Sequence, residues 1–276
     1  MFKRVILITN GNLPSMLALA VWLRAHGHSL VKVYVTYRLP SSKGNVSGGL
    51  SMLRHSGWDY TWLKVWVNRF APMRLRRAGL PASVADYLAA LGLSVPVEAV
   101  DSVKTPEVLA EVRDLAPELL VSFSATQRFP DELIDIPSVG AINVHYGALP
   151  RYAGLSPYYW HLHNEEPEFG VTLHRIEPEL DAGGIIEQSI RPVGDQKTCL
   201  GLMLDMAGQV SPLLNRFHAG EIRLDNVTGQ DLSQRSYFRH PDRAQVADFK
   251  RRGYRMTDAD ARKRVVDQVS ECRPAS

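Results

Sequence analysis

Short runs of apolar residues recur along the first part of the chain, and their pattern predicts a buried parallel sheet. The runs at 4–10 and 30–37 are rich in β-branched residues and do not alternate with polar positions, which is typical of strands buried on both faces. Between them, residues 11–27 have the spacing of an α-helix, with Pro14 near its start. A strand–helix–strand order requires a crossover connection, so we expect the two strands to be parallel.

The same succession of elements continues to about residue 195. Further strands are expected at 94–100, 118–125 and 139–145, and further helices at 83–93, 105–117 and 156–166. Thr105 and Ser156 are the expected N-terminal caps of the last two helices, and a proline follows each of them. Apolar and polar positions alternate on both sides of a turn in 170–193, which predicts a hairpin that closes the sheet. Residues 38–80 have a less regular pattern.

Together these elements predict the fold class. We expect an α/β protein with a Rossmann-like, doubly wound, mostly parallel sheet, a terminal hairpin and a small C-terminal subdomain. The main domain is placed at 1–195, and a helix with a small irregular subdomain at 196–276. A chain of 276 residues suits one large α/β domain with such an appendage, or two modest domains.

Composition narrows the classes of function. The net charge of +3 is too small to predict nucleic-acid binding by itself. Cys199 and Cys272 have no metal-type spacing around them, so we expect no disulfide framework and a reduced, cytoplasmic setting. His161 and His163 point to different sides of a predicted helix, and no metal is expected. No stretch approaches the ~20 apolar residues that cross a bilayer, so the prediction is a soluble protein without a membrane span.

Side chains suited to catalysis follow the predicted strands, at the edge where open parallel sheets bind ligands. Asn143 and His145 are two residues apart, so both point to one face of a strand. An amide donor and an imidazole can together stabilise an oxyanion and move a proton. Asp181 lies in a Gly-rich turn that can reach the same edge, where its carboxylate would favour the protonated imidazole. Taken alone, such an Asn and His are also common as turn-formers or satisfied polar groups, and both interpretations stay open at this point.

This set of residues requires no nucleophilic side chain. No serine lies in a G-x-S-x-G turn. An Asn, a His and an Asp suit acyl transfer in which the substrate itself, such as an amine, attacks a carbonyl.

Three other positions and one segment are candidates for binding. Asn10 follows the first strand, where a phosphate can rest at a helix start, although without a third glycine a plain turn is the better interpretation. Arg151 and Tyr152 form an aromatic-basic turn after His145. Residues 68–79 carry four arginines among apolar residues, which fits a diphosphate, an acidic lipid surface or a solvated helix face.

The segment 142–188 resembles the folate-dependent formyltransferase family. Five short pieces in the family's order and spacing carry this resemblance. They are Asn143-x-His145, Leu149-Pro150, Gly154-x-x-Pro157, Gly170-Val171-Thr172 and Leu180-Asp181-x-Gly183. The family formylates methionyl-tRNA, glycinamide ribonucleotide or nucleotide-linked amino sugars, so the pieces indicate the reaction more closely than the acceptor.

The resemblance implies a catalytic set and a formyl donor. Asn143, His145 and Asp181 would be catalytic, and 10-formyltetrahydrofolate would be the donor, without a metal. An amine would attack the formyl carbon while Asn143 and protonated His145 hold the oxyanion and Asp181 supports His145.

Binding residues are expected on the same basis. The donor would bind at Gln127, Arg128, Phe129 and Gly183, and the acceptor at Asn10, Arg151 and Tyr152. Arg128 occupies a position that is commonly apolar in the family.

A segment near the C-terminus favours one class of acceptor among several. Residues 229–256 resemble tail segments of small formyltransferases that act on amino sugars, although a wrap over the sheet edge would have the same pattern. We therefore expect a nucleotide-linked amino sugar as acceptor, no nucleic-acid partner, and a hairpin or tail edge that can pair two subunits. The alternatives are a methionyl-tRNA or other small-amine formyltransferase, a formyltetrahydrofolate hydrolase, and a catalytically silent folate- or nucleotide-binding protein.

Overall fold

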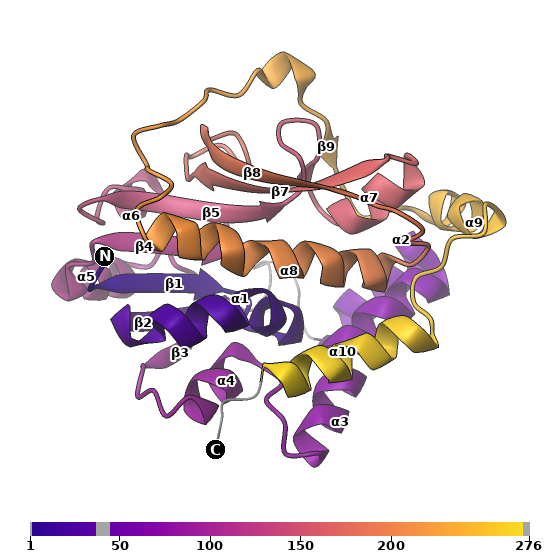
Figure 1. The fold of residues 1–276 in the computed structure, drawn as a ribbon, viewed down its shortest axis with the longest axis horizontal. Coiled ribbons are helices and arrows are strands. Elements are labelled where there is room, and N and C mark those ends of the chain that lie inside the picture. Colours follow the sequence, from indigo (N-terminus) through magenta and orange to yellow (C-terminus); the bar gives the residue numbers. More distant parts are fainter. Residues whose placement is uncertain (1, 37–44, 273–276) are drawn as a thin grey trace.

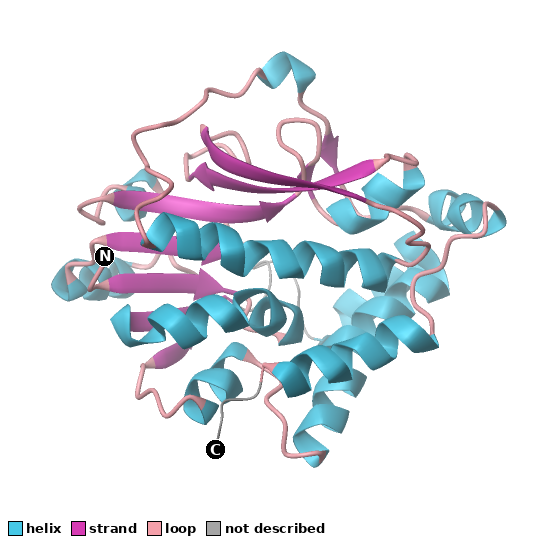
Figure 2. Ribbon diagram, viewed as in Figure 1, coloured by secondary structure: helices cyan, strands magenta, loops and turns pink. Residues whose placement is uncertain are grey.

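A seven-stranded sheet with helices on both faces organises the molecule, as Figure 1 and Figure 2 show. The structure, a computed structural model, describes residues 2–36 and 45–272. The strand order is β3-β2-β1-β4-β5-β7-β8. The first five strands are parallel to one another, and β7 pairs antiparallel with both β5 and β8. The predicted mostly parallel sheet with a terminal hairpin is therefore confirmed.

The strands have the following bounds. The large sheet contains β1 (Val5–Thr9), β2 (Leu30–Thr36), β3 (Val97–Val100), β4 (Leu119–Phe123), β5 (Gly140–Tyr146), β7 (Glu168–Arg175) and β8 (Ile185–Pro192). A second, two-stranded sheet pairs β6 (Ala153–Gly154) with β9 (Tyr237–Phe238).

The helices account for most of the remaining residues. They are α1 (Leu13–His26), α2 (Asn45–Val65), α3 (Ala71–Arg77), α4 (Val84–Ala90), α5 (Pro106–Leu115), α6 (Asp131–Ile134), α7 (Pro157–His163), α8 (Cys199–His218), α9 (Arg243–Arg251) and α10 (Ala259–Glu271). A π-helical turn, η2 (Trp66–Phe70), joins α2 to α3, and two short 3₁₀ turns are η1 (Gly27–Ser29) and η3 (Leu232–Gln234).

The two faces of the sheet are buried by different helices. Helices α1 and α8 cover one face, and α5 and α6 cover the other (Figure 1). Along β1, Val5 and Leu7 pack with α1 and α8, whereas Ile6 and Ile8 pack with α5 and α6. Because successive side chains of a strand point to opposite faces, a strand covered on both sides must be apolar throughout.

The predicted helix caps are correct in one case and wrong in the other. Thr105 accepts a hydrogen bond from the Val108 backbone N–H and caps α5. Ser156 precedes α7 but has a left-handed backbone (φ 58°) and makes no capping hydrogen bond. Its hydroxyl instead contacts the hydroxyl of Tyr60 and Nδ1 of His240, because the turn aims the side chain away from the helix start.

The region 38–80, predicted to be irregular, is largely helical. Residues 38–44 of it lie outside the described residues, and most of the rest forms α2, η2 and α3. Gly57 (φ 77°) interrupts α2, and this break disrupts the helical pattern along the sequence. The inward-facing residues are Tyr60, Leu63, Val67, Ala71 and Leu75, which are spaced as on one side of a helix.

The C-terminal part of the chain from residue 196 onward, called the tail below, is more regular than predicted. It holds the helices α8, α9 and α10 where one helix was expected. Helix α8 shares a hydrophobic cluster with α1, and α9 and α10 contact α2 and α8 respectively. The predicted boundary at residue 195 therefore crosses a continuous core, and the division of the chain there stays a prediction.

Candidate active site

The structure brings His145 and Asp181 together at the carboxyl end of β5. On this strand, Ile142 and Val144 pack into the core beneath α1 and α8, so Asn143 and His145 point to the opposite face. Asp181 lies in the turn between β7 and β8, and its Oδ1 is 3.4 Å from Nδ1 of His145. The two side chains are only 15% and 10% exposed, respectively, so water screens their interaction weakly.

The two ring nitrogens of His145 both lie close to oxygen atoms of the protein. Its Nε2 is 2.7 Å from the carbonyl oxygen of Tyr152. A carbonyl can only accept, so Nε2 carries a proton. The other ring nitrogen, Nδ1, faces the carboxylate of Asp181. Both ring nitrogens thus face groups that accept hydrogen bonds, which fixes the orientation of the ring.

Asp181 is held in a left-handed turn by its neighbours. Its backbone φ is 53°, and its Oδ2 accepts a hydrogen bond of 2.9 Å from the Gly154 N–H. A Cβ atom at Gly154 (φ 92°) would lie 2.3 Å from the carbonyl oxygen of Phe238. Only glycine allows β6 to approach β9 closely enough to place this donor.

The C-terminal tail also supports this turn. Nε2 of Gln230 donates to the carbonyl oxygen of Asp181 at 3.1 Å and to that of Gly183 at 2.6 Å. Arg235 donates to the carbonyl oxygen of Leu180. Gly183 packs so tightly that an added Cβ would lie 2.0 Å from the Arg175 carbonyl oxygen. In the described structure Gly183 therefore shapes the turn that carries Asp181, while its expected contact with the donor stays a prediction.

His174 is a site residue that the sequence analysis missed. Asn143 donates from Nδ2 to Nε2 of His174 at 3.0 Å, and His174 donates from Nδ1 to the Arg175 carbonyl oxygen at 2.7 Å. Burial lowers the pKa of His174 to about 4, although the nearby Asp181 carboxylate opposes this shift. A neutral His174 can accept at Nε2 and so fixes the orientation of the Asn143 amide. The register of β5 against β7 pairs Asn143 directly with His174, and local sequence patterns do not give this register.

The loop after β4 contains the residues expected to bind the donor. The Gln127 side chain binds the backbone, accepting from the Val103 N–H at 3.0 Å and donating to the Asp101 carbonyl at 2.6 Å. Phe129 is buried against the α5–α6 side of the sheet, whereas Arg128 is exposed. Within the described part of the chain, the backbone N–H groups of residues 127–129 donate no hydrogen bond to another protein group. They fit the acceptor atoms of a polar heterocycle such as a pterin.

The three positions expected to bind the acceptor have different surroundings. Tyr152 is 3% exposed, and its ring stacks between His161 and Phe238 with centroid distances of 3.8 and 5.3 Å. Burial raises the pKa of Tyr152 to about 12. Its carbonyl oxygen reaches the site through His145, and the expected contact of Tyr152 with the acceptor stays a prediction.

Arg151 and Asn10 are more accessible. Arg151 is exposed and lies 3.5 Å from Glu166. The Asn10 side chain accepts from the Ser15 hydroxyl at 2.7 Å and so orders the first turn of α1. Both lie near the carboxyl ends of strands, and their contact with an acceptor stays a prediction.

The described ranges contain neither a cluster of metal-binding side chains nor a membrane-spanning helix. No cluster of three His, Cys, Asp or Glu side chains occurs in residues 2–36 and 45–272. Over the same ranges, none of the helices has the length and apolar composition to cross a membrane.

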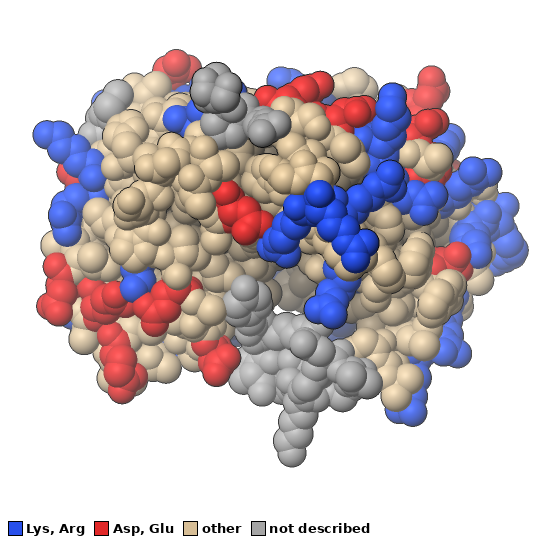
Figure 3. Space-filling model, turned by 90° about the horizontal axis from the view of Figure 1, so that it is seen from below, with Lys and Arg blue, Asp and Glu red and all other residues tan. Residues whose placement is uncertain are grey.

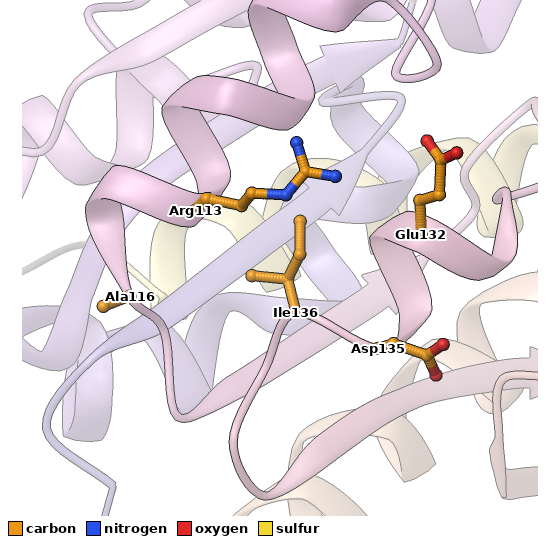
Figure 4. Close-up of a pocket in the computed structure, with 5 residues that line it drawn as sticks. All are labelled: Arg113, Ala116, Glu132, Asp135 and Ile136. Atoms are coloured by element: carbon orange, nitrogen blue, oxygen red, sulfur yellow. The ribbon is translucent and has the colours of Figure 1, made fainter.

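One pocket lies at the end of the sheet opposite to His145 and Asp181. It is lined by Arg113, Ala116, Glu132, Asp135 and Ile136 (Figure 4). Ala116 and Ile136 precede β4 and β5, so this pocket is at the amino ends of the parallel strands. Ligands of open α/β sheets bind at the carboxyl ends, and we do not assign this pocket to the active site.

Comparison with known protein families gives a match over more than half of the chain. The family model for formyl transferases matches residues 52–209. The methionyl-tRNA formyltransferase of Lysinibacillus sphaericus is 32% identical over 199 residues, which cover 71% of this chain and 62% of that protein. The methionyl-tRNA formyltransferase of Geobacter sulfurreducens is 39% identical over 39% of this chain and 34% of its own length. The chain thus matches less than two thirds of the length of these relatives.

Solved structures share the fold at low sequence identity. A sugar N-formyltransferase from a Shewanella species has a TM-score of 0.53 and 18% identity, covering 98% of this chain and 87% of that one. An N-formyltransferase from Helicobacter canadensis, in complex with folinic acid and dTDP-3-aminofucose, has a TM-score of 0.53 and 19% identity over 86% and 71% of the two chains. Glycinamide ribonucleotide transformylase 1 from Symbiobacterium toebii has a TM-score of 0.52 and 16% identity over 83% and 94%.

Proposed function

The chain belongs to the formyl transferase family, and from this premise we propose that it transfers a formyl group from 10-formyltetrahydrofolate to a primary amine of a small molecule. The observation that carries the proposal is the Asn143, His145 and Asp181 arrangement at the carboxyl end of β5. A nucleotide-linked amino sugar is the proposed acceptor.

Asn143 is the proposed donor to the oxyanion. Its amide nitrogen carries two hydrogens, and one of them is used by His174. The second N–H can hold the formyl oxygen as negative charge develops on it. Because His174 fixes the amide in advance, this donor needs no reorganisation during the reaction.

His145 and Asp181 form the proposed charge and proton site. The imidazolium places positive charge beside the oxyanion donor, since Asn143 and His145 share one face of β5. The attacking amine must lose a proton, and the partly exposed Asp181 carboxylate is a base that can receive it. The Nε2–H of His145 donates to the Tyr152 carbonyl oxygen. This hydrogen bond must break before Nε2–H can donate to the substrate.

The formyl donor supplies a carbonyl carried on a nitrogen. After the amine has added to the formyl carbon, the bond to that nitrogen breaks, and the nitrogen takes up the proton that the Asp181 carboxylate received from the amine. The backbone N–H groups of residues 127–129 would hold the pterin ring of the donor, on the same sheet edge as Asn143. These groups have no other partner in the described structure, which supports this placement.

Two observations bear on the acceptor. The fold match with a sugar N-formyltransferase extends over 98% of the chain, tail included, which supports an amino sugar. The sequence relatives are methionyl-tRNA formyltransferases, which supports methionyl-tRNA as the second candidate.

A product assay distinguishes these acceptors. The protein is incubated with 10-formyltetrahydrofolate and either a panel of nucleotide-linked amino sugars, methionyl-tRNA or no acceptor, and products are identified by mass spectrometry. A formylated sugar is the expected result. Formylated methionyl-tRNA alone would replace the proposed acceptor, and donor consumption without any acceptor would indicate a hydrolase. A donor that is neither bound nor consumed would contradict the proposed function.

A further inference from the structure

One helical segment of the protein, residues 45–80, carries a strong positive charge. Residues 45–80 contain six Lys or Arg residues and a single acidic residue, Asp59, which gives this segment a net charge of +5. A second segment, residues 235–264, is also basic, with ten Lys or Arg residues, four acidic residues and a net charge of +6. In Figure 3, which shows the face that carries α3, Lys and Arg side chains gather at the centre and right.

The segment 45–80 also exposes large apolar side chains. Leu50, Phe70 and Met73 are 44%, 42% and 44% exposed. Trp58 is 65% exposed, more than any other large hydrophobic residue in the described part of the chain. Exposed apolar side chains grouped in this way mark a surface that contacts another apolar phase.

The aromatic rings form a continuous row. Trp58 stacks on Trp62 with ring centroids 5.9 Å apart, and Trp62 contacts Phe70 at 5.2 Å. A groove beside the row is lined by Trp58, Trp62, Tyr254 and Met256, with Arg255 and Arg262 among its basic residues. Basic residues of the tail therefore extend the positive surface around the tryptophans.

Most arginines of the segment have no acidic partner among residues 2–36 and 45–272. Arg76 pairs with Asp86, and the acidic residue of the segment, Asp59, pairs with Lys250. Arg54, Arg69, Arg74 and Arg77 are exposed and form no ion pair with any residue of the described structure. Their charges are available to an external anionic surface.

We propose that this α2–α3 surface binds the surface of an anionic lipid bilayer. It consists of Leu50, Arg54, Trp58, Arg69, Phe70, Met73, Arg74 and Arg77. Tryptophan, phenylalanine and aliphatic side chains insert at the boundary between headgroups and acyl chains, and arginines bind the lipid phosphates. Nucleic acids offer bases that stack on aromatic rings, but they give no favourable site for the aliphatic Leu50 and Met73. The combination therefore favours a bilayer over a nucleic acid.

Vesicle co-flotation tests this proposal without using enzymatic activity. The full chain is mixed with vesicles of phosphatidylcholine alone or of phosphatidylcholine with phosphatidylglycerol. Binding is expected only to the second kind. Trp58→Ala with Phe70→Ala should weaken it at least tenfold, because the inserted rings are lost, and Arg69→Glu with Arg74→Glu should abolish it.

Matched variants elsewhere on the surface serve as controls. Val139→Ala with Leu232→Ala removes exposed apolar side chains, and Arg113→Glu with Arg191→Glu makes the same change of charge. Both should bind vesicles as the unchanged protein does. Because Trp58 and Phe70 are exposed, replacing them with alanine should leave the thermal unfolding temperature unchanged. An unchanged temperature excludes misfolding as the cause of lost binding.

Three results would overturn the proposal. The first is absence of binding to the anionic vesicles. The second is binding that the aromatic substitutions do not affect, which would indicate adsorption by charge alone. The third is salt-sensitive binding to RNA under conditions in which vesicles are not bound.

Discussion

At the scale of single residues, the site depends on how four side chains orient one another. His174 fixes the amide of Asn143, and Asp181 with the Tyr152 carbonyl fixes the imidazole of His145. Each of these groups is largely buried, so their relative positions are set before a ligand binds. Such preorganisation is the main source of electrostatic stabilisation in enzymes.

Asn143→Ala tests the proposed oxyanion donor. Loss of one such hydrogen bond typically reduces kcat by about 10²–10³, or ~2.7–4 kcal/mol of transition-state stabilisation. We expect a loss of this size with little change in the far-ultraviolet circular dichroism spectrum. Asn226→Ala, at an exposed position outside the site, is the control and should retain full activity. Equal kcat values for the two variants would remove Asn143 from the mechanism.

At the scale of secondary-structure elements, the tail acts on the site through the turn between β7 and β8. Strand β9 pairs with β6 and thereby positions Gly154, while Gln230 binds the backbone of Asp181 and Gly183. We infer that Gln230 is a positioning residue, because it holds the left-handed turn that carries the carboxylate.

Gln230→Leu should therefore lower kcat about tenfold with little change in the KM for the donor. A displacement of the carboxylate by about 1 Å is sufficient for a loss of this order or larger. Steady-state kinetics in both substrates separate the two constants. Gln268→Leu, on α10, is the matched control. If KM rises while kcat is kept, Gln230 supports ligand binding and does not position Asp181.

The elements differ in how far the sequence predicts them. The strands were predicted because uniformly apolar, β-branched runs are typical of the buried strands of a parallel sheet. The helical nature of α2 and α3 was missed because Gly57 and the arginines obscure the spacing of the buried residues. His145 and Asp181 were found by resemblance, but His174 depends on strand register and Gln230 on a contact between distant segments. Neither kind of information is present in local patterns.

At the scale of the whole molecule, buried histidines connect folding to pH. Burial lowers the pKa of His161, His174, His218 and His240 to about 4 in each case. In the unfolded chain these groups have a pKa near 6.5. Between pH 6.5 and 4 the unfolded state therefore binds more protons than the folded state, and the free energy of unfolding falls as the pH is lowered.

His218→Phe tests this linkage at one position. His218 stacks on His26 at 3.8 Å and contacts the ring of Phe2 at 5.3 Å, so an aromatic replacement keeps the packing. Urea unfolding measured from pH 7 to 4 should show a pH slope that is shallower by up to about 1.4 kcal/mol per pH unit. His28→Phe, at an exposed position, should leave the slope unchanged. An unchanged slope in His218→Phe would show that this histidine is protonated in the folded state.

The most direct test of the proposed function is the rate of formyl transfer in the unchanged protein and in His145→Ala, measured side by side. With 10-formyltetrahydrofolate and a nucleotide-linked amino sugar, the unchanged protein should form the N-formyl sugar. His145→Ala should be slower by about 10²-fold or more, because the charge and proton site is lost. His28→Ala should match the unchanged protein. Equal rates for the unchanged protein and His145→Ala, or no formylated product with any amine, would contradict the proposed mechanism.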